Sequence, residues 1–183
     1  MKSIQDYITE KMIYKKSVVT NYKYFPETKE ELKDIIKKLV DKQSTEDIIN
    51  LNSIDSSQIT DMSYLFAGME DLIKIDLSDW DVSNVKTMKD MFRDCQNLER
   101  IIGIENWNVS NVTNMRYMFI GCKSFNQQLN KWDTSKISDM SHMFYDCKSF
   151  NQDISNWNVE NITNASTIFY NCPIEEKHKP KFK

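Results

Sequence analysis

Glycine and proline are scarce in this sequence, with three of each among 183 residues. Fibrous and low-complexity chains are rich in these residues, so their scarcity argues against a fibrous or disordered protein. A hydrophobic content of 40% is adequate for a core. At this length we expect a single domain.

Long apolar runs are absent as well. No stretch of the sequence approaches the ~20 apolar residues that a membrane-spanning helix needs. The first residues, MKSIQDYITEKM, carry Lys2, Asp6 and Glu10 and lack the apolar core of a secretory signal peptide. The first cysteine is Cys95, so the start of the chain has no lipobox. We therefore expect a cytoplasmic protein with no membrane partner.

Charge is spread unevenly along the chain. Residues 1–43 have a net charge of +3, residues 44–173 of −8 and the residues from Ile174 of +2, which sum to −3. A surface that follows a nucleic-acid backbone needs basic side chains. The acidic central region therefore argues against a nucleic-acid partner and is typical of a solvated surface.

The main feature of the sequence is an internal repeat. The pattern WDVSNVKTMKDMFRDC starts at Trp80 and recurs at Trp107, Trp132 and Trp157, and a degenerate copy runs from Ile59 to Met69. Counted between equivalent phenylalanines, the period is 25 to 27 residues. Its variation is confined to the segment before each tryptophan, which predicts a surface loop there.

Apolar residues in each repeat recur at the spacing i, i+3, i+4, i+7, as in Met88, Met91, Phe92 and Cys95. This spacing predicts a helix of about two turns. Ser, Thr, Asp or Asn stands before the apolar run and can cap the helix. A residue type that accepts a left-handed backbone can end each helix at one shared position: Gly68, Asp94, Gly121, Asp146 and Asn171.

The rest of each repeat, such as residues 150–157, is typical of short strands or turns. One strand and one helix per repeat predict an α/β fold, a short right-handed leucine-rich-repeat-like solenoid of about five repeats with an α-helical N-terminal cap. Asn84, Asn111 and Asn161 predict a ladder of side chains between repeats, which Lys136 interrupts.

We divide the chain into a helical N-terminal capping region (1–50), a repeat solenoid (51–173) and a basic C-terminal tail (174–183). A short helix is predicted from Ser3 to Met12. Thr28 and Glu31 form a capping box before an amphipathic helix. This helix either caps the solenoid or binds a partner. Phe182 is expected to fold back over the last repeat.

The repeat resembles that of the BspA-like leucine-rich-repeat family, which reads roughly WDVSNVTDMSYMFxGCxxFNQDIS. Matching residues run from about Ile54 to Cys172. The resemblance implies a solenoid without catalytic residues, found in bacterial surface proteins and in tailed-phage proteins. This sequence departs from the surface members because it has no export signal. A phage-encoded protein in the host cytoplasm is therefore a further alternative.

The four cysteines, Cys95, Cys122, Cys147 and Cys172, share one repeat position. A disulfide or a zinc site is the alternative. Cysteines at one repeat position form a column along the repeats, which lacks the tetrahedral geometry of a zinc site, and the sequence has no C-x-x-C pair. We expect free, reduced thiols buried as small apolar side chains.

Candidates for other chemistry are few. The two histidines, His142 and His178, form no Ser-His-Asp or Cys-His arrangement, and no glycine-rich phosphate loop is present. Four aspartates, Asp79, Asp81, Asp133 and Asp153, lack the spacing of a calcium loop. The sequence therefore predicts no catalytic residue, no cofactor, no cofactor-binding residue and no metal ligand.

The tryptophans are predicted to pack between repeats, with ligand stacking as the alternative. The positions that vary between repeats point away from the predicted core and carry residue types common at interfaces. Ordinary solvated positions are the alternative. The candidate partner-binding residues are Tyr64, Arg93, Arg116, Tyr117, His142, Tyr145 and Tyr170.

These observations favour a monomeric, non-enzymatic protein–protein interaction module inside the cell. The inference from fold to function is partly an analogy. A bacterial surface protein of the adhesin type is the alternative, and an enzyme of unknown type is the third. The sequence does not identify the protein partner.

Overall fold

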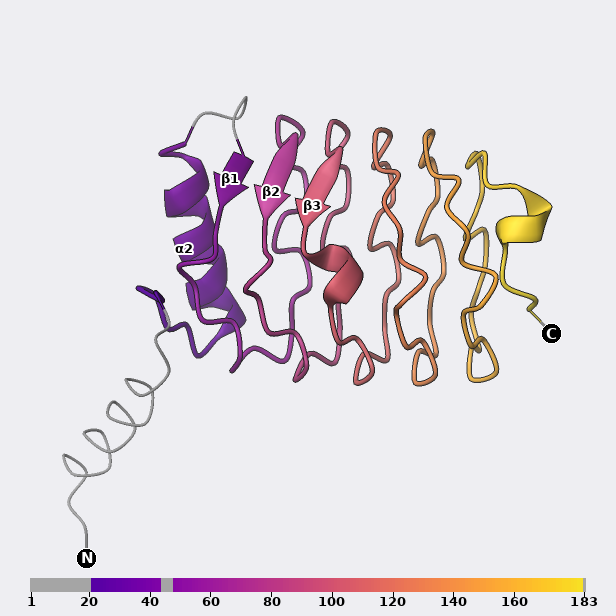
Figure 1. The fold of residues 1–183 in the computed structure, drawn as a ribbon, viewed down its shortest axis with the longest axis horizontal. Helices are drawn as coiled ribbons and strands as arrows, with labels where there is room; N and C mark the ends of the chain where they lie inside the picture. Colours follow the sequence, from indigo (N-terminus) through magenta and orange to yellow (C-terminus); the bar gives the residue numbers. More distant parts are fainter. Residues whose placement is uncertain (1–20, 44–47, 183) are drawn as a thin grey trace, which may run out of the picture.

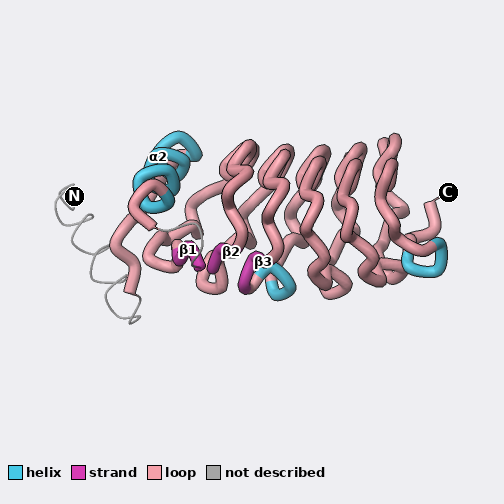
Figure 2. The backbone as a smooth tube through the Cα atoms, turned by 90° about the horizontal axis from the view of Figure 1, so that it is seen from above, coloured by secondary structure: helices cyan, strands magenta, loops and turns pink. Residues whose placement is uncertain are grey.

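The structure, a computed structural model, describes residues 21–43 and 48–182. Its elements are α2 (Lys29–Val40), β1 (Ile48–Asn50), β2 (Lys74–Asp76), β3 (Arg100–Ile102) and two 3-10 helices, η1 (Ile104–Asn106) and η2 (Glu176–His178). From α2 at one end, successive loops lie side by side as far as the C-terminal end (Figures 1 and 2). The helix predicted from Ser3 to Met12 lies outside the described residues.

The helix α2 forms where the capping box predicts it. The Thr28 hydroxyl accepts a hydrogen bond from the Glu31 N–H at 3.2 Å, and the Glu31 carboxylate accepts one from the Thr28 N–H at 3.3 Å. Leu32 and Ile36 on the inner face are fully buried. The predicted amphipathic helix is therefore confirmed.

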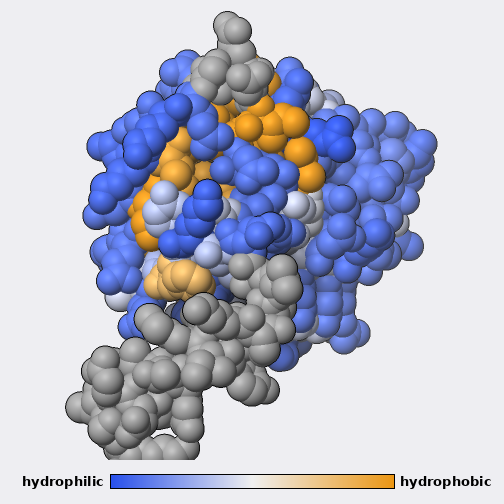
Figure 3. Space-filling view, turned by 60° about the vertical axis from the view of Figure 1, so that its left-hand side comes forward, coloured by the Kyte–Doolittle hydropathy of each residue, from blue (hydrophilic) through white to orange (hydrophobic). Residues whose placement is uncertain are grey.

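Some apolar surface remains at the α2 end of the molecule. Figure 3 looks toward this end and shows an apolar band among hydrophilic side chains. Phe25 is 49% exposed and Ile48, in β1, is 48% exposed. None of the described helices is long and apolar enough to cross a membrane.

The three strands form a parallel sheet in the order β1-β2-β3. β2 and β3 occupy the segments of variable length before Trp80 and Trp107. The predicted surface loop is therefore wrong before Trp80 and Trp107, and it is confirmed before Trp132 and Trp157. The segments before Trp132 and Trp157 are shorter and carry no strand, so residues 150–157 contain no strand either.

A glutamine side chain stands at each edge of this sheet. At the β3 edge, the Gln127 amide accepts from the Ile101 N–H at 2.6 Å and donates to the Ile101 carbonyl at 3.2 Å. At the β1 edge, the Gln43 Oε1 accepts from the Asn50 N–H at 3.1 Å. Both side chains take up hydrogen bonds that a further strand would make.

The opposite side of the molecule consists of five turn segments, residues 61–69, 87–95, 114–122, 139–147 and 164–172. We call this stack the turn row. Parallel bridges join the first residues in succession: Asp61, Thr87, Asn114, Asp139 and Asn164.

Alternate backbone N–H groups in the turn row donate to carbonyls of the following segment, four at each junction. At the central junction these bonds are 2.9 to 3.0 Å long, and their donors are Met115, Tyr117, Phe119 and Gly121. The turn row is therefore held together by backbone hydrogen bonds along its whole length.

The prediction of a short right-handed leucine-rich-repeat-like α/β solenoid of about five repeats is wrong. Over the described residues, the structure has one α-helix and one small three-stranded sheet, and the expected repeat helices are turns. The cause is a left-handed residue in the middle of each turn segment, which a right-handed helix cannot include. These residues, with φ between 50° and 62°, are Tyr64, Asp90, Tyr117, His142 and Thr167.

Consecutive tight turns reproduce the spacing that resembled a helix. The N–H groups of Met91, Arg93 and Cys95 each donate to the carbonyl three residues earlier. Apolar side chains three or four residues apart therefore face inward without a helix. The predicted left-handed position before each cysteine is confirmed, with φ from 55° to 76° at Gly68, Asp94, Gly121, Asp146 and Asn171.

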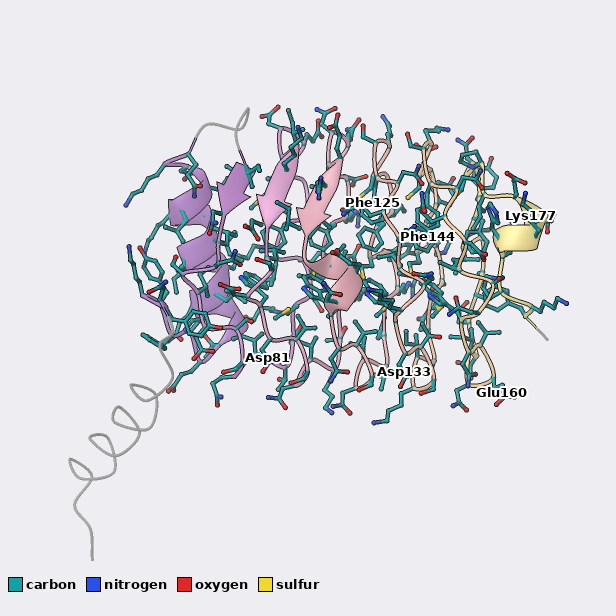
Figure 4. All side chains as sticks on the ribbon, viewed as in Figure 1. Asp81, Phe125, Asp133, Phe144, Glu160 and Lys177 are labelled. Atoms are coloured by element: carbon teal, nitrogen blue, oxygen red, sulfur yellow. The ribbon has the colours of Figure 1, made fainter. Side chains whose placement is uncertain are left out.

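Stacked aromatic rings form the centre of the core. Phe92, Phe119 and Phe144 stack at centroid distances of 5.6 and 5.7 Å. Phe125 lies 4.4 Å from Phe119, and Phe150 lies 4.1 Å from Phe144. Figure 4 shows the labelled Phe125 and Phe144 inside the molecule, between successive loops.

The tryptophans pack as predicted. All four are at most 5% exposed. The Nε1 groups of Trp80, Trp132 and Trp157 donate to carbonyls at 2.9 to 3.2 Å, whereas the buried Trp107 Nε1 has no partner. The packing interpretation is therefore confirmed, and the ring faces are not available to a ligand.

Candidate partner-binding surface

The turn row presents its variable side chains on the outside of the molecule. Four of the left-handed central residues, Tyr64, Tyr117, His142 and Thr167, have exposed or half-buried side chains, whereas the fifth, Asp90, is buried. Tyr64 and Tyr170 are 37% and 57% exposed, and Tyr117, His142 and Tyr145 are half-buried. The predicted candidates therefore lie on one surface of the turn row.

Three of the candidates form a continuous stack. The Arg116 guanidinium lies 4.5 Å from the centroid of the Tyr117 ring, and its Nη2 donates to the Tyr117 hydroxyl at 2.8 Å. The Tyr117 ring also stacks on His142, with a centroid distance of 4.7 Å. The hydrogen bond with Tyr117 raises the pKa of Arg116, so this cation stays charged. His142 Nδ1 lies 2.6 Å from the Thr167 Oγ1.

A second stack lies next to the first. Tyr145 and Tyr170 stack at a centroid distance of 4.7 Å, and Tyr145 lies 6.0 Å from His142 in a tilted arrangement. The two stacks together join Arg116, Tyr117, His142, Tyr145 and Tyr170 into one surface over three turn segments. We call these five residues the aromatic surface.

Tyr64 and Arg93 are not part of this surface. Lys89 lies 5.6 Å from the Tyr64 centroid. The Arg93 guanidinium contacts Asp94 at 3.2 Å and Asp90 at 3.5 Å. Asp90 is fully buried at the position where Tyr64 is exposed and Tyr117 is half-buried. It therefore interrupts the aromatic column between those two tyrosines.

Stacking decides which atoms a partner can reach. Tyr117 and His142 cover one face of each other, as do Tyr145 and Tyr170, so ring edges form part of the surface that a partner meets. The edge of an aromatic ring carries partial positive charge, and Arg116 adds a full charge. The aromatic surface therefore favours hydrogen-bond acceptors, such as carboxylates and peptide carbonyls.

The cysteines occupy the inside of the same segments. All four are free thiols, and Cys95, Cys122 and Cys147 are fully buried, as predicted, whereas Cys172 is half-buried. The Cys95 Sγ donates to the Phe66 carbonyl at 3.0 Å. Burial raises the pKa of Cys95 to about 12, and it raises the pKa of Cys122 and Cys147 well above the ordinary range. These thiols therefore stay protonated and shielded.

The acidic side chains considered as calcium ligands have a structural role. Asp133 accepts the Ser135 N–H at 3.0 Å, and Asp81 accepts the Ser83 N–H at 2.9 Å. Figure 4 shows both aspartates at the ends of separate loops. Within residues 21–43 and 48–182, no group of three or more His, Cys, Asp or Glu residues could hold a metal ion.

A shallow depression of about 330 Å³ lies beside the β3 edge. Its lining residues are Glu99, Arg100, Ile102, Glu105, Gln127 and Gln128. Of these, Gln127 is already bonded to the backbone of Ile101. Side chains of both charges line the depression, but they do not bring a nucleophile and a base together.

A comparison with protein families matches residues 30–103 and 97–176 to the family described as "Mycoplasma protein of unknown function, DUF285". The two matches together span most of the chain. The chain belongs to this family. No curated protein and no solved structure matches the chain.

The DUF285 match supports the resemblance to a bacterial repeat family, while the particular BspA-like repeat stays a prediction. Both matched stretches contain turn segments, and the aromatic surface lies in the second. The sequence did not single out Thr167 and Lys89, which contact His142 and Tyr64. Lys89 and Thr167 occupy the same two variable repeat positions as Arg116 and Tyr117, and this was the available signal.

Proposed function

We propose that this chain is a monomeric, non-enzymatic protein–protein interaction module whose partner binds the aromatic surface. The observation that carries the proposal is the pair of half-exposed ring stacks on consecutive turn segments. Interfaces draw most of their binding energy from a few aromatic and arginine anchors. Rings already fixed by stacking lose little side-chain freedom on binding.

The chemistry of the surface specifies the kind of partner. Ring edges, hydroxyls and the Arg116 guanidinium all attract acceptors, so an acidic protein segment fits better than a basic one. Backbone hydrogen bonds hold the turn row together, so the aromatic side chains are available to contact a partner. We place the protein in the cytoplasm, where its four free cysteines are compatible with a reducing environment.

The test is a fourfold variant in which Arg116, Tyr117, His142 and Tyr145 are replaced by Ala. We expect capture of the native partner from the source cell to fall at least tenfold, with an unchanged circular dichroism spectrum. The matched control replaces four exposed residues elsewhere by Ala: Lys33, Asp34, Lys131 and Glu160.

The control variant should retain capture. If both variants capture the partner equally well, the aromatic surface is not the binding site. If deletion of residues 1–43 alone abolishes capture, the helix α2 region carries recognition instead. Fractionation of tagged protein tests the cytoplasmic placement, and recovery at the cell surface would favour an adhesin-type protein.

A further inference from the structure

The peptide groups of the turn row form four continuous hydrogen-bonded chains that run from one end of the row to the other. One of them consists of four bonds from a methionine N–H to a carbonyl of the next segment: Met62 to Thr87, Met88 to Asn114, Met115 to Asp139 and Met140 to Asn164. Each acceptor carbonyl belongs to the same peptide group as the next donor. The other three chains start at Tyr64, Phe66 and Gly68.

All four chains point in the same direction. Aligned peptide dipoles add, as they do in an α-helix, so donors collect at one end and acceptors at the other. The donor end is the last turn segment, residues 164–172. The backbone N–H groups that continue the four chains there make no hydrogen bond within the described residues: Ala165, Thr167, Phe169 and Asn171.

The C-terminal tail covers only the other side of this end. The Ile154 N–H donates to the His178 carbonyl at 3.0 Å, as Leu51 donates to Asp76 and Leu77 to Ile102. In Figure 2, η2 lies on the same side of the molecule as the strands. Phe182 packs against the core, as predicted. The Lys179 Nζ, 5.7 Å from the Phe169 centroid, marks the border of the covered part.

Apolar side chains accompany the free donors. Phe169 and Cys172 are half-buried, whereas their equivalents Phe144 and Cys147 are fully buried by the next segment. The end of the turn row therefore has the donors and the apolar surface that each inner junction buries.

We propose that this end binds a turn segment of the same kind, supplied by another polypeptide whose own acceptor edge is uncovered. The site differs from the aromatic surface and does not depend on it. The four inner junctions show the required geometry: a row of four carbonyls meets a row of four N–H groups.

Other occupants satisfy this edge less well. An ordinary β-strand presents N–H and C=O groups alternately along one edge, so its own N–H groups would face the donors. Two copies of this chain meeting at these ends would oppose donors with donors. The acceptor edge of a second copy, at residues 61–67, lies on the side that α2 covers (Figure 2). A separate segment with an open acceptor edge meets none of these obstacles.

The experiment uses the isotopically labelled full chain and a synthetic peptide of residues 137–146, ISDMSHMFYD. In the free protein, we expect the amides of the four end donors to exchange with solvent at least tenfold faster than their inner equivalents. The inner equivalents are Met140, His142, Phe144 and Asp146. On titration, the peptide should shift the end amides and slow their exchange.

Two controls make the result specific. A peptide of reversed sequence should leave the end amides unchanged. Ala165→Pro removes one free donor without removing an internal bond, and it should weaken peptide binding about 2- to 12-fold, as expected for one hydrogen bond. An unchanged amide signal for Met140, which donates to Asn164, verifies that the variant keeps its last junction.

Three results would overturn the proposal. They are protected end amides in the free dilute protein, protection that rises with protein concentration alone, and equal binding of the forward and reversed peptides. The second result would identify a second copy of the chain as the occupant.

Discussion

The turn row and the three-stranded sheet lie on opposite sides of the same molecule and differ in how regularly they are built. The turn row repeats four backbone bonds at every junction from residue 61 to residue 172. The sheet spans only β1 to β3, and a side chain, Gln127, replaces the next strand. The difference shows that regularity on one side is enough to keep successive loops in register.

The same difference explains where the chain tolerates length changes. The segments before Trp80 and Trp107 are longer than those before Trp132 and Trp157, and all of these changes fall on the sheet side. An insertion in the turn row would shift four hydrogen bonds at two junctions. On the sheet side, a change in length only exchanges a loop for a short strand: the longer segments carry β2 and β3, and the shorter ones carry no strand.

The largest expected effect comes from the core under the turn row. Phe119 is fully buried and stacks on Phe92, Phe125 and Phe144. Phe119→Ala should lower the free energy of unfolding by about 3–5 kcal/mol, measured by urea denaturation. Ile101→Ala in β3 should cost less, because the sheet side has fewer backbone bonds to disturb. A larger loss of unfolding free energy for Ile101→Ala than for Phe119→Ala would contradict the view that the turn row contributes more stability than the sheet.

The next effect tests the left-handed positions. Gly121→Ala would place a Cβ against the Asp94 carboxylate of the preceding turn segment, at φ 72°. We expect a loss of about 2–4 kcal/mol from overpacking and backbone strain together. Gly68→Ala is the matched control, because φ is 76° and nothing lies within 4 Å. Its loss should be about 1–2 kcal/mol, and equal losses would exclude the steric contribution.

Two tryptophans on the sheet side provide a smaller, paired effect. The Trp132 Nε1 donates to the Ile104 carbonyl at 2.9 Å, whereas the Trp107 Nε1 is buried without a partner. Trp132→Phe removes this hydrogen bond, while the Ile104 carbonyl keeps the one from the Trp107 N–H at 3.3 Å, so it should cost about 0.5–1.5 kcal/mol more than Trp107→Phe. Thermal unfolding of the two variants measures this difference, and the opposite order would show that Trp107 is hydrogen-bonded in solution.

The sheet edge should tolerate change better still. Gln127→Leu removes both hydrogen bonds to Ile101 and should cost about 1 kcal/mol, since the site is only partly buried. Gln128→Leu, at the exposed neighbouring position, should change stability by less than about 0.5 kcal/mol. Denaturant titrations of both variants give the comparison. If the two variants unfold alike, Gln127 does not complete the sheet.

The smallest effect is a pH dependence where α2 meets the turn row. Lys29 Nζ lies 2.8 Å from the Asp61 Oδ2. Burial would raise the pKa of Asp61, but hydrogen bonds from Lys29 and Ser63 outweigh it and hold the pKa below the ordinary 3.8. The unfolded chain therefore takes up the proton first on acidification. The stability from this pair is present above about pH 4 and is lost as the pH falls further.

The Asp61→Asn variant isolates this effect. Its stability deficit relative to the original chain should be present at pH 6 and shrink toward pH 3. The deficit should be small, because the Asp61 side chain is 42% exposed. A deficit that is constant with pH would show that folding does not lower the pKa of Asp61.

The sequence predicted the features that depend on residue type at fixed spacing. The capping box at Thr28, the buried tryptophans and the left-handed position at Gly121 are all confirmed. It failed where the decisive quantity was the sign of φ at an ordinary residue. Nothing in the residue type of Tyr117 indicates a φ of 60°, so an apolar spacing shared by helices and consecutive turns was assigned to helices.

The candidate surface was predictable as a set of positions but not as an arrangement. Position in the repeat placed Arg116, Tyr117, His142, Tyr145 and Tyr170 outside. The stacking between neighbouring segments depends on the turn geometry, which the helix assignment had wrong. Asp90 shows the limit: it shares its position with Tyr117, yet it is fully buried.

The glutamines at the two sheet edges have a consequence for solubility. Exposed strand edges are templates on which other chains add strands, and unblocked edges lead to aggregation and fibre growth. Gln43 and Gln127 engage the β1 and β3 backbones with groups that mimic a peptide unit. Each glutamine occupies backbone groups that an added strand would need, which makes strand addition at either edge of this short sheet less favourable.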